Sequence, residues 1–245
     1  MSTDPSDLEI VKSVKEISWS NDPTDRTVSS RFSKLKGYLS KNFSISDEVL
    51  KKLRPPVELT QKILEENLEI RNNKTEKDFS QDDINNLLSL RTNSRTPFEK
   101  SIYLQLVSGR RISELFENKI RIDNKHPKQV KMMLNKTGSK STKYFTFDLL
   151  KDDDLTGKDF KKMVTSLRTS VSGMSLNDFT KRVNKTLKGI MPKLTSHSLR
   201  SMYGVYRYHT DNPDNKILTG FISEVLNHQD GSDSGINYSA MKFTN

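Results

Sequence analysis

The chain has 245 residues and a net charge of +10, which is enough for one large domain or two modest ones with a buried core. It has no cysteine, which excludes a disulfide scaffold, a thiolate zinc site and a cysteine nucleophile. It lacks a run of about 18 apolar residues, and its first residues lack the basic-then-apolar order of a secretory signal. We therefore expect no membrane span and an intracellular protein, cytoplasmic or, if the host or its virus is eukaryotic, nuclear.

Helical patterns separated by breakers fill the first part of the chain. Ser80 is followed by glutamine and two aspartates, a pattern typical of a helix N-cap. Arg54-Pro55-Pro56 ends an earlier helix, because the residue before a proline avoids the helical conformation. The spacing predicts helices over residues 7–18, 27–41, 47–53, 57–72 and from 80 to about 90. A loop or domain junction is expected between about 72 and 97.

The second part of the chain begins with an apolar helix over 98–107, which Ser108-Gly109 ends, and a short helix over 111–118. The period then changes to two, and three short strands are predicted around residues 120–122, 130–134 and 144–147. Helical patterns return over 158–168, 176–190, 198–208 and 218–227. The expected fold class is mainly α with a small antiparallel β-sheet (α+β), divided into domains 1–90 and 91–245.

The positive charge is concentrated in the second part. Residues 1–100 carry 17 Lys and Arg against 17 Asp and Glu, whereas residues 101–245 carry 24 against 14. A polyanionic partner, most commonly nucleic acid, is the natural interpretation. The alternative is a solvated basic surface without a partner. The balanced first part still offers a basic face, formed by Arg31, Lys34, Lys36, Lys41, Lys51, Lys52 and Arg54.

Four separated segments each place a cation, an imidazole or a phenol where a helix or turn can present it. They are residues 108–115 (SGRRISEL), 135–140 (NKTGSK), 196–200 (SHSLR) and 226–228 (LNH), the last followed by Tyr238. Alone, each has an ordinary structural explanation: a surface pair, a solvated helix start, a hairpin turn or a packed ring. Only their combination and order are specific.

Together these segments resemble the catalytic domain of tyrosine recombinases, over about residues 80–245. That family has a Thr-Gly-x-Arg-x-x-Glu-Leu helix start, a hairpin lysine, a His-x-x-Arg helix, and a Leu-Gly-His segment before the nucleophilic tyrosine. Here Ser108 replaces the threonine and Asn227 the glycine, and the tyrosine follows the histidine by ten residues, one more than usual. The resemblance assigns six residues to the active site: Arg111, Lys136, His197, Arg200, His228 and Tyr238.

The resemblance implies DNA cleavage through a 3′-phosphotyrosine link. Arg111 and Arg200 would clamp the non-bridging phosphate oxygens, because arginine donates two hydrogen bonds and stays protonated. Tyr238 would attack phosphorus, and Lys136 would protonate the 5′-oxygen that leaves. His197 is the candidate general acid or base, and His228 a hydrogen-bond donor to phosphate.

No metal and no cofactor are expected. The four histidines, His126, His197, His209 and His228, show no close zinc spacing.

Some assignments have rivals. Arg110 could replace Arg111 if the register shifts by one, and Lys140 or Lys143 could replace Lys136. The predicted DNA contacts are Arg110, Lys140, Lys143, Arg31 and Lys34. Tyr203, Tyr206 and Tyr208 follow the His-x-x-Arg pattern at helical spacing and are expected to be packing residues.

Further details are similar to protelomerases, the hairpin telomere resolvases of the same superfamily. They are the Ser-Gly-Arg-Arg run, the polar insertion 209–216 and the Tyr-x-x-x-Lys-Phe pattern from Tyr238. The chain is shorter than the protelomerases. The resemblance implies an integrase, resolvase or telomere resolvase of a virus, phage or mobile element. Its implied partners are double-stranded DNA and further copies of the chain, as a dimer or tetramer. The alternatives are a type IB topoisomerase and a DNA-binding or packaging protein that does not cut.

Overall fold

The structure is a computed structural model. It describes residues 25–42, 46–52, 57–72, 77–122, 124–133, 144–151, 153–212, 214, 216–227 and 241–244. The chain forms two compact units, residues 1–74 and 75–245.

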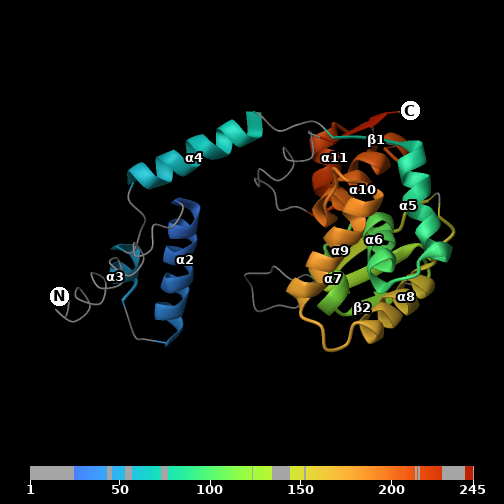
Figure 1. Ribbon diagram of the computed structural model, residues 1–245, viewed down its shortest axis with the longest axis horizontal. Coiled ribbons are helices and arrows are strands. Elements are labelled where there is room, and N and C mark those ends of the chain that lie inside the picture. The colour runs from blue at the N-terminus through green and yellow to red at the C-terminus, as the bar shows by residue number, and fades with distance from the viewer. Residues whose placement is uncertain are drawn as a thin grey trace. The chain divides into compact units, whose positions relative to one another are not determined.

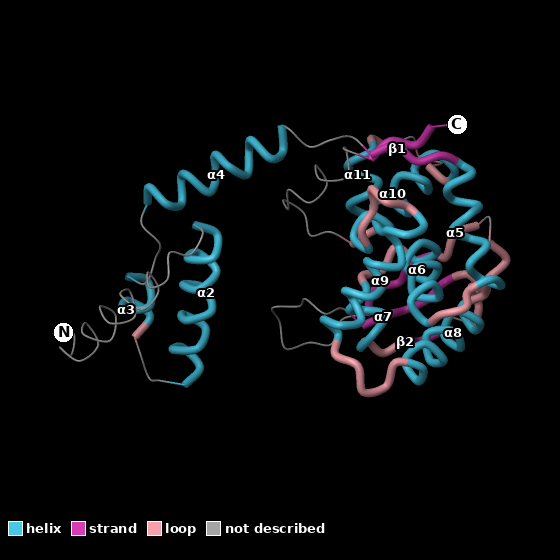
Figure 2. Tube along the Cα trace, in the orientation of Figure 1, coloured by secondary structure: helices cyan, strands magenta, loops and turns pink. Residues whose placement is uncertain are grey.

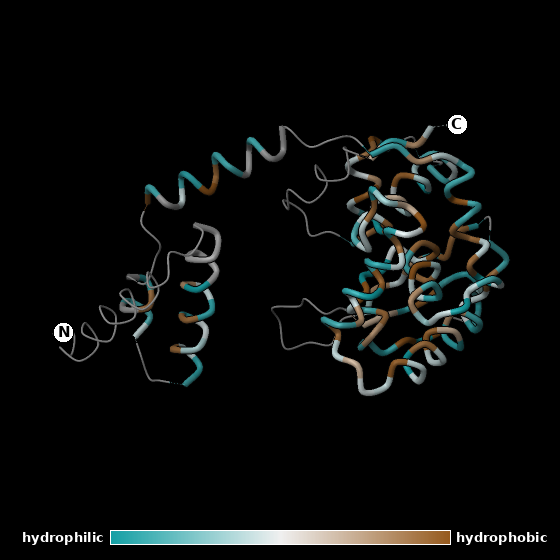
Figure 3. Tube along the Cα trace, viewed as in Figure 1, coloured by the Kyte–Doolittle hydropathy of each residue, from teal (hydrophilic) through white to brown (hydrophobic). Residues whose placement is uncertain are grey.

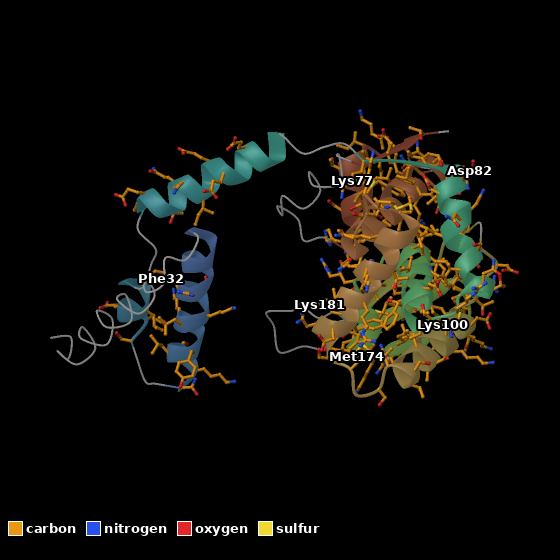
Figure 4. All side chains as sticks on the ribbon, in the orientation of Figure 1. Phe32, Lys77, Asp82, Lys100, Met174 and Lys181 are labelled. Carbon is orange, nitrogen blue, oxygen red and sulfur yellow. The ribbon has the colours of Figure 1, made fainter. Side chains whose placement is uncertain are left out.

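The first unit is helical. Its described elements are α2 (Asp25–Asn42), α3 (Asp47–Lys52) and α4 (Val57–Asn72). Phe32 on α2, labelled in Figure 4, is 2% exposed and packs with Ile63 on α4. These helices confirm the predicted segments 27–41, 47–53 and 57–72, while the predicted helix over 7–18 lies outside the described residues.

The second unit holds the large core. In chain order its described elements are β1 (Lys77–Ser80), α5 (Gln81–Asn93), α6 (Pro97–Ser108), α7 (Ile112–Glu117), β2 (Ile120–Ile122), β3 (Gln129–Met133), β4 (Tyr144–Asp148), α8 (Gly157–Ser170), α9 (Leu176–Ile190), α10 (Ser196–Thr210), α11 (Leu218–Val225) and β5 (Met241–Thr244). The most apolar stretches lie in its interior (Figure 3), where one continuous hydrophobic cluster forms.

Helix α6 is the centre of this unit. It begins at Thr96, whose hydroxyl accepts from the Glu99 backbone N–H, with Pro97 at the first helical position. Every residue from 101 to 108 is buried, and the helix contacts α5, α8, α9 and α10 (Figure 1). A stretch of helix that is buried on all sides needs neighbours on all sides, so α6 fixes the positions of the helices around it.

Two separate sheets complete the unit (Figure 2). Strands β2, β3 and β4 form an antiparallel sheet in that order, with Ile120 opposite Met132 and Val130 opposite Phe147. Strands β1 and β5 pair in parallel, with Lys77 opposite Met241. The three-stranded sheet confirms the sequence prediction, whereas the β1–β5 pair was not anticipated.

The predicted fold class is confirmed: the second unit is mainly helical with a small antiparallel sheet. Helix α5, with its Ser80 cap, packs on α6. The predicted domain division after residue 90 therefore falls inside α5, whereas the two compact units divide after residue 74. Among the described helices, none combines the length and apolar character needed to cross a membrane.

Candidate active site

A strained turn follows α6. Gly109 has φ +63° and ends the helix, its N–H donating to the Gln105 carbonyl over 2.9 Å. A Cβ atom added to Gly109 would overlap the Tyr203 ring, lying 2.7 Å from Cε1 and 2.8 Å from Cγ. Only glycine meets both conditions, because a side chain is disfavoured at this φ and has no room here. Tyr203 on α10 thus holds the turn that presents Arg110 and Arg111.

Arg200 connects three of the four sequence segments. Its side chain is buried, with the residue only 1% exposed. Nη1 donates to the Gly109 carbonyl and Nη2 to the Leu226 carbonyl, each over 2.5 Å. Segments 108–115, 196–200 and 226–228, which are far apart in the chain, therefore meet at one guanidinium.

Arg110 is also 1% exposed. Its Nε donates to the Ser108 carbonyl over 3.3 Å and its Nη2 to the Val225 carbonyl over 3.5 Å. Its guanidinium carbon lies 4.9 Å from the ring centre of Phe145 and 4.8 Å from that of Phe147. Burial, with the Arg200 cation nearby, lowers the pKa of Arg110 to about 10. The predicted contact of Arg110 with DNA would require these interactions to break.

Arg111 is the more accessible of the two neighbouring arginines, with 40% of its side chain exposed. It lies at the N-cap of α7, where its N–H donates to Glu114 Oε2 over 2.9 Å and its Nη1 to Oε1 over 3.0 Å. Burial acts to raise the pKa of Glu114, but Arg110, the Arg111 N–H and Arg200 outweigh it and hold this pKa below its usual value. The charges of three arginines therefore act on one buried carboxylate.

The structure places His197 near the start of α10, three residues before Arg200, with its side chain exposed. The start of the helix is fixed by Asn184 of α9, whose Oδ1 accepts from the Ser196 N–H over 2.8 Å. Exposure at this position is what the predicted role of His197 requires.

Asn227 occupies the place of the family's glycine, and its conformation explains the substitution. Its φ is +52°, and it is the only non-glycine residue with positive φ among those the structure describes. Asparagine tolerates this region better than other side chains do. The position where the resemblance implies a glycine therefore has a left-handed backbone in this chain, a conformation that glycine and asparagine both adopt.

Replacement of Asn227 by valine is expected to destabilise the protein by about 1–2 kcal/mol, because a β-branched residue is strained at positive φ. Replacement by glycine is expected to be neutral or slightly stabilising. Urea denaturation of both variants measures the difference. The control is Asn86, exposed on α5, where valine should be better tolerated than glycine. The same order at both positions would contradict the conformational argument.

Several predicted residues lie outside the described ranges: Lys136, Lys140, Lys143, His228 and Tyr238. Their roles stay predictions. Arg31 and Lys34 are exposed on α2 in the first unit, as DNA contacts would require. Within the described ranges, no group of three or more His, Asp or Glu side chains could hold a metal ion.

The sequence predicts no role for Glu114 or Tyr203 beyond register and packing. Glu114 had a signal: a glutamate three residues after a helix N-cap is half of a capping pattern. Tyr203, predicted to be a packing residue together with Tyr206, is buried, as is Tyr206. Its contact with Gly109 had no sequence signal, because 94 positions separate them.

No protein-family model and no curated protein sequence matches the chain. Solved structures do. Protelomerase TelA covalently complexed with substrate DNA matches with a TM-score of 0.75 at 17% identity, covering 99% of this chain and 84% of that one. A variant of TelA complexed with a DNA hairpin product matches with a TM-score of 0.74 at 16% identity, covering 99% and 90%. Protelomerase TelK complexed with substrate DNA matches with a TM-score of 0.65 at 16% identity, covering 98% of this chain but 54% of TelK. The resemblance predicted from the sequence therefore holds at the level of structure, and the chain has the fold of the protelomerases.

Proposed function

We propose that this protein cleaves and rejoins duplex DNA at specific sites through a 3′-phosphotyrosine intermediate. One observation carries the proposal: Arg200 joins the turn at Gly109 to Leu226 and so gathers three of the four sequence segments. A surface pair or a solvated helix start would not explain why these segments converge.

The charge of the gathered residues fits a phosphodiester. Arg110, Arg111 and Arg200 carry three positive charges and Glu114 one negative charge, so the cluster has an excess of positive charge. Arg110, Arg200 and Glu114 are buried, and Arg111 is partly exposed. An anion that enters the cluster is strongly stabilised, because opposite charges attract each other more strongly at low dielectric. This stabilisation increases as negative charge develops on the phosphoryl oxygens in the transition state.

Arg111 and Arg200 differ in exposure, and therefore in when each contacts the phosphate. With 40% of its side chain exposed, Arg111 meets the phosphate first. Arg200 is 1% exposed and already donates to two carbonyls. Its guanidinium has five N–H groups, so it can keep these contacts and still donate to phosphate, but the phosphate reaches it only after neighbouring segments open.

The remaining steps use residues outside the described ranges, together with His197. The Tyr238 phenol oxygen bonds to phosphorus, and its proton passes to His197. The bond from phosphorus to the 5′-oxygen breaks, and Lys136 donates the proton that this oxygen takes up. His228 donates a hydrogen bond to the phosphate. Rejoining reverses each proton transfer and the transfer of the phosphoryl group. The phosphotyrosine link conserves the energy of the broken phosphodiester bond, so rejoining needs no ATP.

Among the enzymes that use this chemistry, we propose a hairpin telomere resolvase rather than an integrase, another resolvase or a type IB topoisomerase. Support comes from the fold shared with TelA, one of whose structures is described as a complex with a DNA hairpin product. The Ser-Gly-Arg-Arg run and the polar insertion 209–216 point the same way. The partners would be double-stranded DNA and further copies of this chain, as a dimer or tetramer.

The test is covalent trapping on nicked DNA. The substrate is a library of duplexes with a randomised, nicked centre, incubated in EDTA and separated on a denaturing gel. We expect a slowly migrating protein–DNA band with the wild type and none with Tyr238→Phe, because the phenylalanine ring has no oxygen to attack phosphorus.

The recovered sequences then form intact duplexes, on which hairpin products indicate a telomere resolvase and exchanged strands an integrase. A band from both proteins would contradict the assignment of the nucleophile. Tight binding without any band would favour the DNA-binding alternative.

A further inference from the structure

Two buried arginines bind consecutive carbonyls at two helix ends. Arg110 donates to the carbonyls of Ser108 and Val225, and Arg200 donates to those of the next residues, Gly109 and Leu226. Ser108 and Val225 are the last residues of α6 and α11. The two side chains therefore run as a pair between the C-terminal ends of these helices.

This pairing has a physical reason. The last carbonyls of a helix have no partner within the helix and carry the negative end of its dipole. Two such ends close together in the interior need donors and positive charge, and arginine supplies both. Removing either arginine would leave carbonyls of both helices without these donors.

Arg110 also contacts two aromatic rings. Its guanidinium lies against the rings of Phe145 and Phe147 on β4. Strand β4 directly follows the segment that contains Lys136, and α11 leads to the segment that contains His228 and Tyr238. One side chain thus contacts the turn of Arg111 and two elements that lead to the other predicted catalytic residues.

We propose that Arg110 is a positioning residue for strand cleavage: it holds the arginine turn, β4 and the end of α11 in register without touching DNA. The inference rests on the proposed function. It assigns different roles to two adjacent, chemically identical side chains, since Arg111 contacts the phosphate and Arg110 holds the site around it.

The first test compares Arg110→Met and Arg110→Lys with the wild type. Methionine keeps an apolar chain against the two rings but loses all donors, and lysine keeps the charge but not the planar fork. We expect the single-turnover cleavage rate of folded Arg110→Met to fall about 100-fold, because small misplacement of reacting groups has an effect of this size. DNA affinity should not change, and Arg110→Lys should recover part of the rate.

The matched control is Tyr103→Phe. Tyr103 is fully buried on the same helix, α6, and its hydroxyl donates over 2.7 Å to Asp153, which belongs to none of the four segments. The substitution removes this buried hydrogen bond and should leave the cleavage rate of the folded protein unchanged. Urea denaturation sets conditions in which each variant is folded. A rate for Arg110→Met equal to that of Tyr103→Phe would overturn the inference.

A second substrate separates positioning from phosphate contact. A methylphosphonate at the cleavage position has no charged non-bridging oxygen, so an arginine that stabilises this charge becomes less important. The defect of Arg111→Ala should shrink on this substrate, and the defect of Arg110→Met should persist. If the defect of Arg110→Met shrinks as much as that of Arg111→Ala, Arg110 contacts the phosphate and the inference is wrong. If the wild type forms no covalent product with either substrate, the proposed function itself fails.

Discussion

Gly109→Ala is expected to destabilise the second unit by about 2–5 kcal/mol, from backbone strain of about 1–2 kcal/mol and overpacking of about 1–3 kcal/mol. The strain arises at φ +63°, and the overpacking arises because the new methyl group meets the Tyr203 ring. Cleavage by the remaining folded protein should also fall, since the Gly109 carbonyl accepts from Arg200. Urea denaturation and single-turnover cleavage measure the two effects.

Gly173 offers a control that isolates the backbone term. Its φ is +84°, but nothing lies within 4 Å of an added Cβ. Gly173→Ala should therefore cost only the strain, about 1–2 kcal/mol, and leave cleavage unchanged. If the two variants lost equal stability, the contact between Gly109 and Tyr203 would have no energetic importance.

Arg200→Lys is expected to lose both catalysis and stability. A lysine cannot donate to two carbonyls and a phosphate from one planar fork, so cleavage should fall by about 100- to 1,000-fold, as for the loss of one transition-state donor. The free energy of unfolding should fall by about 2–3 kcal/mol, because a buried carbonyl loses a charged donor. Urea denaturation measures the loss of stability, and single-turnover cleavage measures the loss of activity.

Arg111→Ala is the informative comparison for Arg200. Its side chain is 40% exposed and its partner Glu114 also accepts from a backbone N–H, so cleavage should fall about 100- to 1,000-fold with a much smaller loss of stability. Full cleavage by Arg200→Lys would exclude the proposed contact of Arg200 with phosphate. Equal stability losses in both variants would contradict the structural role of Arg200.

Local patterns predicted most of the helices and the three-stranded sheet. The predicted bounds of α4 and α9 agree with the structure residue for residue, because apolar spacing and capping act over a few neighbours. Ser80 caps α5 through a reciprocal bond with Asp83, as its sequence indicated. Such signals depend only on residues within about one helical turn of each other.

Long-range features were not predictable in the same way. Strands β1 and β5 have four residues each and pair across more than 160 positions, so neither has a periodic pattern of its own. Arg110 and Arg111 are chemically identical, and long-range contacts of Arg110 with Val225, Phe145 and Phe147 distinguish the buried cation from the accessible one. The meeting of segments at Arg200 could be expected from a family resemblance, but not its contacts with two carbonyls.

The pairing of β1 with β5 has a mechanical consequence. Strand β1 is the first described element after the first unit, and β5 is the first described element after the segment that contains Tyr238. Their leading residues, Lys77 and Met241, lie side by side, and Phe243 of β5 packs on Tyr206 of α10. A force on the chain at Lys77, the first residue of β1, would therefore be shared by β5, whose backbone follows the predicted nucleophile Tyr238 in the sequence.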